Sequence, residues 1–141
     1  MALLFNRQTA LSCAIILCVG IYSRPGLAYS AAIDSGNCTI STPGGWTHNG
    51  ATAVSPDGAT SLTIAETPSS QLAVQFEEKM GGTIEVEDSN TIVVSKALPT
   101  NGGYRYYAVT KTSPSCSITV TASTAAGKAI ARQISATIRR K

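Results

Sequence analysis

Apolar and polar residues alternate over several short stretches of the chain, the pattern of half-buried β-strands. The clearest alternation runs over 116–123, where Cys116, Ile118, Val120 and Ala122 share one face and hydroxyl side chains dominate the other. Similar stretches predict strands at 38–40, 53–54, 61–64, 83–87, 91–97 and 104–111. The Ser-Pro-Asp-Gly sequence at 55–58 predicts a hairpin turn, because proline presets φ and Asp-Gly tolerates a positive φ.

Two stretches carry the helical period instead. Residues 71–80 follow two serines suited to N-capping, and they place Leu72, Phe76 and Met80 on one apolar stripe. A second helix is expected over 124–138, with Ile130, Ile134 and Ile138 as its buried stripe. The resulting order, β-β-β-α-β-β-β-β-α, predicts a single α+β domain over 31–141, an antiparallel sheet covered by two helices.

The N-terminal 30 residues have the pattern of a cleavable signal peptide. Arg7 precedes an uncharged, mainly apolar run over 10–21, and Pro25 and Gly26 then break any helix. Small residues follow, so cleavage is expected within 28–32. A retained membrane anchor is the alternative, since Arg24 is an unusual charge for a cleavage region, but the run is short of the roughly 20 residues a span needs. We expect an exported protein with no stable membrane span after cleavage, periplasmic in a Gram-negative source and otherwise secreted.

Four cysteines are present, and two of them, Cys13 and Cys18, would leave with the signal. Cys38 and Cys116 remain, and in an oxidising compartment a lone pair is most simply a disulfide. Both lie on the predicted core side of their strands. Neither a CxxC redox pair nor a zinc site fits this spacing.

Charge and candidate chemistry exclude several function classes. After residue 30 the chain carries nine Lys and Arg against eight Asp and Glu, so no basic field for nucleic acid exists, and the basic tail at 139–141 suits a helix C-terminus. The only histidine, His48, lies in a Gly-rich loop, and no nucleophile, base and orienting group are recognisable together. Glu85 and Glu87 are expected on the solvent face of their strand, opposite Ile84 and Val86. We expect no catalytic residues, metal or cofactor.

The most informative polar set is aromatic. Tyr104 and Tyr106 share one face of the strand at 104–111, and Arg105 and Tyr107 share the other, expected to lie near solvent or at a sheet edge. Tyr and Arg are enriched where proteins bind one another. The simpler interpretation is cross-strand packing beside a partly solvated arginine.

Trp46 and His48 complete the candidate binding surface proposed for Arg105 and Tyr107. A buried role in the core is the simpler interpretation of Trp46, and a solvated loop position is the simpler one for His48.

The order of these motifs resembles the Mog1/PsbP-like fold. The resemblance rests on the Pro-Gly-Gly-Trp corner at 43–46, the hairpin at 55–58, the amphipathic helix, the strands that follow and the closing Ile-rich helix. It implies a binding or accessory protein of the exported DcrB or PsbP type, without a shared catalytic set. The chain departs from the family in its short connections and its disulfide.

Two functions follow as expectations. The first is an exported, non-enzymatic protein that engages a protein partner in the cell envelope through a sheet face or edge, for instance an immunity or inhibitor protein. The alternative is a small-molecule or lipid-binding module with a cavity between sheet and helices, lined by Leu62, Phe76 and Ile134. An enzyme would come third. The sequence does not define an oligomeric state.

Overall fold

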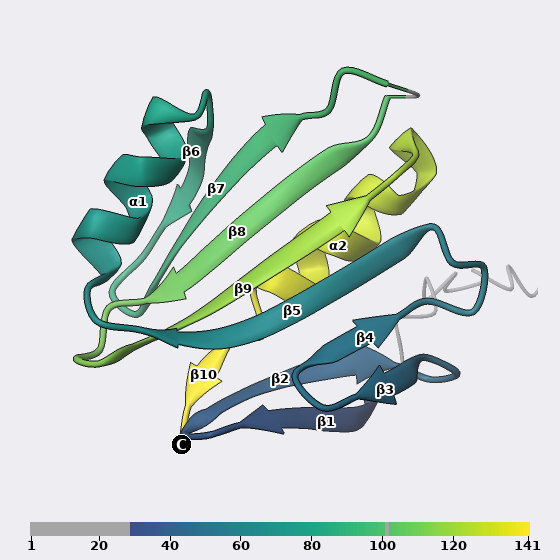
Figure 1. The fold of residues 1–141 in the computed structure, drawn as a ribbon, viewed down its shortest axis with the longest axis horizontal. Coiled ribbons are helices and arrows are strands. Elements are labelled where there is room, and N and C mark those ends of the chain that lie inside the picture. Colours follow the sequence, from purple (N-terminus) through teal and green to yellow (C-terminus); the bar gives the residue numbers. More distant parts are fainter. Residues whose placement is uncertain (1–28, 101) are drawn as a thin grey trace, which may run out of the picture.

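The computed structural model describes residues 29–100 and 102–141, so the predicted signal lies almost wholly outside the described residues. It confirms an α+β architecture of antiparallel sheets and two helices (Figure 1). The elements are β1(Tyr29–Ser35), β2(Cys38–Pro43), β3(Thr47–Asn49), β4(Thr52–Val54), β5(Thr60–Thr67), α1(Ser70–Lys79), β6(Thr83–Glu87), β7(Thr91–Ala97), β8(Tyr104–Thr110), β9(Ser115–Ala122), a 3-10 turn η1(Ala125–Gly127), α2(Lys128–Ser135) and β10(Arg139–Arg140). In the described part of the chain, no helix is long and apolar enough to cross a membrane.

The larger sheet has seven strands in the order β3-β4-β5-β9-β8-β7-β6. Its centre is β9, whose apolar residues Cys116, Ile118, Val120 and Ala122 are all fully buried, as the alternation predicted. The hairpin between β4 and β5 also forms as predicted: Gly58 has φ +71°, and its N–H donates to the carbonyl of Ser55 at 2.9 Å.

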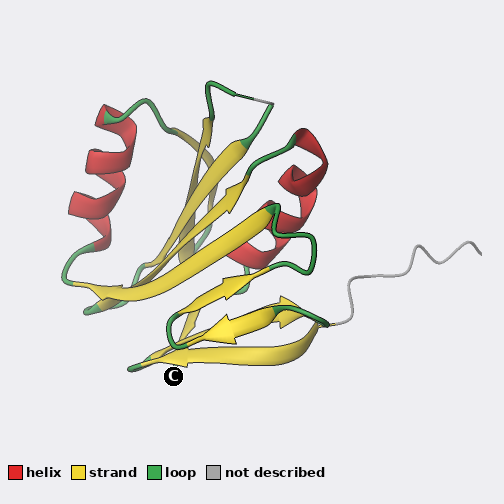
Figure 2. Cartoon of the chain, turned by 45° about the vertical axis from the view of Figure 1, so that its right-hand side comes forward, coloured by secondary structure: helices red, strands yellow, loops and turns green. Residues whose placement is uncertain are grey.

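The two helices cover opposite faces of this sheet (Figure 2). On one face, α2 and the smaller sheet enclose the main core, which includes Tyr106, Ile118 and Ile134. On the other face, α1 packs over β6, β7 and β8 and encloses a second cluster. That cluster consists of Val74, Ile92, Val94 and Val109, with Tyr107 packed against it. Both faces of β8 are therefore covered.

The smaller sheet, in the order β1-β2-β10, contains two strands that the periodicity did not predict. The basic tail had been expected at a helix C-terminus, and this is wrong because α2 ends at Ser135. The hydroxyls of Ser135 and Thr137 donate to the last helical carbonyls at 2.8 Å, and the chain then turns back to pair with β2 as β10. Ile138 is buried, as predicted, but lies beyond the helix.

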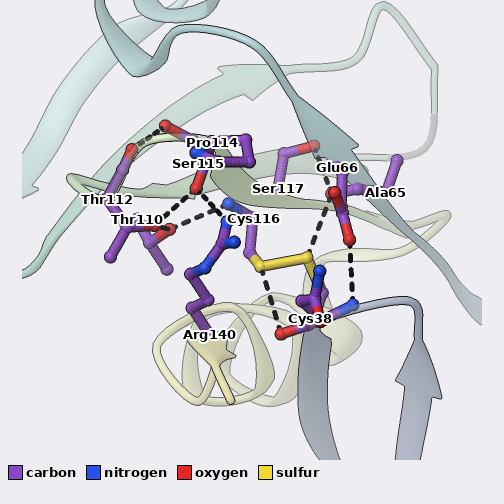
Figure 3. Close-up of a disulfide and its surroundings, with 11 residues drawn as sticks. Cys38, Ala65, Glu66, Thr110, Thr112, Pro114, Ser115, Cys116, Ser117 and Arg140 are labelled. Atoms are coloured by element: carbon purple, nitrogen blue, oxygen red, sulfur yellow. Dashed lines mark hydrogen bonds between the residues drawn. A yellow bond between two sulfur atoms is a disulfide. The ribbon is translucent and has the colours of Figure 1, made fainter.

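The Cys38–Cys116 disulfide is confirmed and joins the two sheets (Figure 3). Cys38 opens β2 and Cys116 lies in β9, and both are fully buried. Beside the bond, the Glu66 carboxylate of β5 accepts from the backbone N–H of Asn37 at 2.9 Å. The polar backbone at the disulfide end of β9 is also paired, since the N–H of Cys116 donates to the Thr110 hydroxyl at 2.8 Å.

Candidate functional site

Arg105 and Tyr107 do share a strand face, but the structure places them beneath α1 instead of in solvent. The Arg105 guanidinium forms two parallel hydrogen bonds of 2.9 Å to the Glu77 carboxylate of α1. The Glu77 side chain is only 8% exposed and that of Arg105 31%. The solvent-facing arrangement is therefore not formed, and the simpler interpretation holds: the pair packs beside a partly solvated arginine, because a helix covers this face as well as the opposite one.

Tyr107 lies beside this ion pair as part of the second apolar cluster. It packs with Val74 and its neighbours on β7 and β8, and burial raises the pKa of its phenol. Tyr104 and Tyr106 lie on the opposite face, with ring centroids 6.3 Å apart, and the Lys128 ammonium stands 3.8 Å from the Tyr104 ring centre. The three tyrosines therefore serve packing, and a partner would reach Arg105, which is 31% exposed, only in part.

The largest uncovered apolar side chains lie on α1. Leu72 is 67% exposed, Phe76 60% and Met80 50%, so the stripe that the helical period identified faces solvent. We had expected it to pack on the sheet, and this is wrong. The helix instead turns Val74 and Glu77 inward, since Glu77 meets Arg105 on the sheet beneath. The stripe repeats every four residues and extends for about 12 Å along the helix at 1.5 Å per residue.

Next to α1 runs β6, an edge strand of the larger sheet, in which every residue is exposed. Its register shifts between Ile84, opposite Val94, and Val86, opposite Val93. Because Val94 and Val93 belong to the two different cores, this β-bulge directs Ile84 and Val86 to opposite faces.

The same bulge separates the two glutamates of β6. Glu85 forms an ion pair with Arg132 of α2 at 3.5 Å, whereas Glu87 pairs with Lys111 at 2.8 Å and lines a groove under α1. The prediction that Glu85 and Glu87 share a face is thus wrong, since an inserted residue inverts the alternation. The groove has a volume of about 490 Å³, and its apolar floor is formed by Val74, Ile84 and Ile92.

Trp46 and His48 lie in a different part of the molecule from Arg105 and Tyr107. Four strand spacings separate β3 from β8, about 19 Å at 4.8 Å per strand. His48 is exposed but lies in strand β3, so its expected position in a loop is wrong. Its Nε2 lies 2.9 Å from the Thr42 hydroxyl. Trp46 is half-buried against the main core and borders a pocket of about 360 Å³ at the start of α2. The four residues do not form one surface.

The cavity expected between Leu62, Phe76 and Ile134 does not form. Leu62 and Ile134 are buried in the main core, while Phe76 is exposed on the helix that covers the other face of the sheet. These three side chains therefore cannot line a common cavity. Among residues 29–100 and 102–141, no group of three or more His, Cys, Asp or Glu side chains could hold a metal ion.

No family model matches the chain, and the comparison with curated proteins found no match.

Proposed function

We propose that the protein is an exported, non-enzymatic binding protein that engages a protein partner in the cell envelope through the α1–β6 surface. This surface comprises the outward stripe of Leu72, Phe76 and Met80 on α1 together with the adjoining edge strand β6. The observation that carries the proposal is the exposure of Leu72 and Phe76, which are 67% and 60% accessible. Large apolar side chains gathered on one exposed element are typical of interaction sites.

The chemistry around the stripe favours a protein partner. Large apolar and aromatic side chains such as Phe76 and Leu72 form the centre of protein interfaces, and a polar rim surrounds them. Gln75, Glu78 and Lys79 supply such a rim on the same helix. The edge strand β6 adds backbone N–H and C=O groups on the side away from β7, which an extended segment of a partner can pair with.

Export and fold relationship belong to the same proposal. The buried disulfide supports an oxidising compartment, because such bonds rarely persist in the cytosol. The Mog1/PsbP-like relationship is part of the proposal on the order of the sequence motifs, and that resemblance implies a binding or accessory protein. An immunity or inhibitor protein fits these features, since a small disulfide-bonded domain with an exposed apolar helix face can bind and cover the site of another protein.

The test is photo-crosslinking in the native envelope. A benzophenone amino acid replaces Phe76 in one variant and Val54 in a matched control, because Val54 is an exposed apolar residue at 40% but lies on β4, away from α1. We expect one discrete crosslinked protein band from position 76 and none from position 54. Equal labelling at both positions, or no crosslink at either, would reject the α1–β6 surface.

A substitution at Phe76 that leaves stability unchanged then measures how much this side chain contributes to binding. Phe76→Ala should change the free energy of unfolding by no more than about 0.5 kcal/mol, the range of surface substitutions, because the ring is exposed. The same substitution should weaken binding to the captured partner by about 2 kcal/mol, as for a central interface residue. Val54→Ala should change neither quantity. Unaltered affinity of Phe76→Ala for the crosslinked protein would contradict the proposal.

A further inference from the structure

A second surface, remote from α1, has the features of a small-ligand site. Three segments meet around a pocket of about 360 Å³: the loop that carries Trp46, the β4–β5 turn at 55–60, and, from the far end of the chain, η1 and the start of α2 at 124–130. Ligand pockets occupy about 300–1,000 Å³, so this pocket is at the small end of that range.

Glycines allow the walls to approach one another. Gly45 has φ +82°, and a Cβ there would lie 3.3 Å from the Pro56 ring, so the Trp46 loop packs directly on the β4–β5 turn. Gly127 is buried, and a Cβ there would lie 2.9 Å from both the Thr60 hydroxyl and the Ala122 side chain. The pocket is therefore held by close backbone approach, and the Ser123 N–H ties the turn to the end of β9 by donating to the Ala59 carbonyl at 2.8 Å.

The wall is apolar on one side. Trp46, Pro56 and Ile130 line it, and Trp46 is only half-buried. An indole presents a flat π-face together with one N–H donor, a combination that suits a ligand with an apolar face and polar edges. The C–H face of a pyranose ring has this character.

The other side supplies polar groups in a fixed arrangement. The Asp57 carboxylate accepts from the Ser55 hydroxyl at 2.5 Å and from the Ala59 N–H at 3.0 Å. Both bonds fall on Oδ1, so within the described residues Oδ2 is left for a ligand. Thr60 also lines the pocket, and although the residue is only 3% exposed, its hydroxyl is a second polar group on this wall.

Electrostatics select the charge of the ligand. Hydrogen bonds from Ser55 and the Ala59 N–H lower the pKa of Asp57, so its carboxylate is ionised and repels anions. Thr124, whose side chain makes no cap hydrogen bond to η1, lines the opposite rim together with Ala126 and Gly127. A ligand that has no negative charge and carries hydroxyl groups can bond to both sides.

We propose that this pocket, built by Trp46, Pro56, Asp57, Thr60 and the start of α2, binds a neutral saccharide unit. The sugar ring stacks on the Trp46 indole, and its hydroxyls bond to Asp57 Oδ2 and the Thr60 hydroxyl. The site lies apart from the α1–β6 surface and does not depend on the function proposed for it. A cell-wall glycan and a free sugar present the same chemistry here.

Trp46 is the only tryptophan of the chain, so its fluorescence reports the pocket directly. The mature protein is titrated with chitotriose, cellotriose and maltotriose as neutral probes, and with choline and inorganic phosphate as charged ones. We expect a saturable change in emission with at least one trisaccharide, at a millimolar or lower dissociation constant. Selectivity for chitotriose points to cell-wall glycan, and equal response to all three points to free sugars.

Matched variants locate the site. Thr60→Val removes the hydroxyl at constant shape and should weaken binding about tenfold, the value of one hydrogen bond. Thr121→Val removes a hydroxyl from β9 outside the pocket and should bind as the wild type does. If Thr60→Val fails to fold, Thr124→Val at the exposed rim replaces it and should weaken binding severalfold. No response to any trisaccharide, a response to choline or phosphate instead, or equal binding by the pocket and control variants would overturn the proposal.

Discussion

The Arg105–Glu77 ion pair gives the sharpest test of how α1 is held. Two substitutions remove the pair from opposite sides: Arg105→Ala deletes the cation, and Glu77→Gln neutralises the anion at constant volume. The pair spans α1 and β8, with two hydrogen bonds of 2.9 Å and unequal burial of its partners. Because of that inequality, the two variants are expected to differ.

The magnitudes follow from what each change leaves behind. Arg105→Ala leaves a carboxylate with 8% exposure and no cation, and removing one partner of a fully buried pair costs about 3–5 kcal/mol. Since water can enter part of the space vacated by the arginine, we expect about 2–3 kcal/mol. Glu77→Gln leaves an arginine that is 31% exposed and can reach solvent, and the amide keeps one hydrogen bond. We expect about 1 kcal/mol for that change.

Thermal and urea denaturation followed by circular dichroism measure both values. A domain of this size shifts by about 4 °C for each 1 kcal/mol, so Arg105→Ala should melt about 8–12 °C below the wild type and Glu77→Gln about 4 °C below. Lys111→Ala is the control, because its 2.8 Å pair with Glu87 is exposed on both sides and is worth less than about 1 kcal/mol. A loss for Arg105→Ala no larger than that of Glu77→Gln would refute the reasoning.

Two further predictions concern the disulfide and the mature N-terminus. Replacing Cys38 and Cys116 with serine reopens a loop with a separation of 78 residues. From the loop-closure entropy, the free energy of unfolding should fall by about 4.5 kcal/mol, which denaturation measures. Two free thiols in the unfolded wild type would disprove the bond. The exported protein should begin at Tyr29, because cleavage after Ala32 would remove Tyr29, Ala31 and Ala32, which pair with β2. Intact mass measures this, and a start at Ile33 would contradict it.

Where one physical signal dominates, the sequence predicts the fold well. The alternation over 116–123 predicted the central strand β9, because a strand with one face in the main core must alternate. The turn at 55–58 also followed from local chemistry alone. The disulfide was predicted because both remaining cysteines lie on the core face of their strands, although 78 residues separate them.

Other elements depend on tertiary pairing that periodicity does not encode. β10 has two residues and exists only because β2 is beside it. The bulge in β6 inverts the faces of Glu87 and Val86, and the sequence over 83–87 alternates as if it were regular. The sequence also did not predict the pocket beside Trp46, although it contains Gly127 and the two glycine-containing loops that build the pocket. Their convergence is a property of the folded chain.

The orientation of α1 is the most consequential of these differences. Adjacent helical residues are about 100° apart, so a rotation that buries Glu77 must carry Phe76 outward. A helix selected for stability alone would bury its apolar stripe. Here the Arg105–Glu77 pair selects the other rotation, the role best attested for buried ion pairs, which fix register more than they add stability. Replacing both residues with leucine should therefore leave stability equal or higher while removing the constraint that holds Phe76 at the surface, and partner capture should fall as it does for Phe76→Ala. Undiminished capture by that double variant would separate the ion pair from the proposed function.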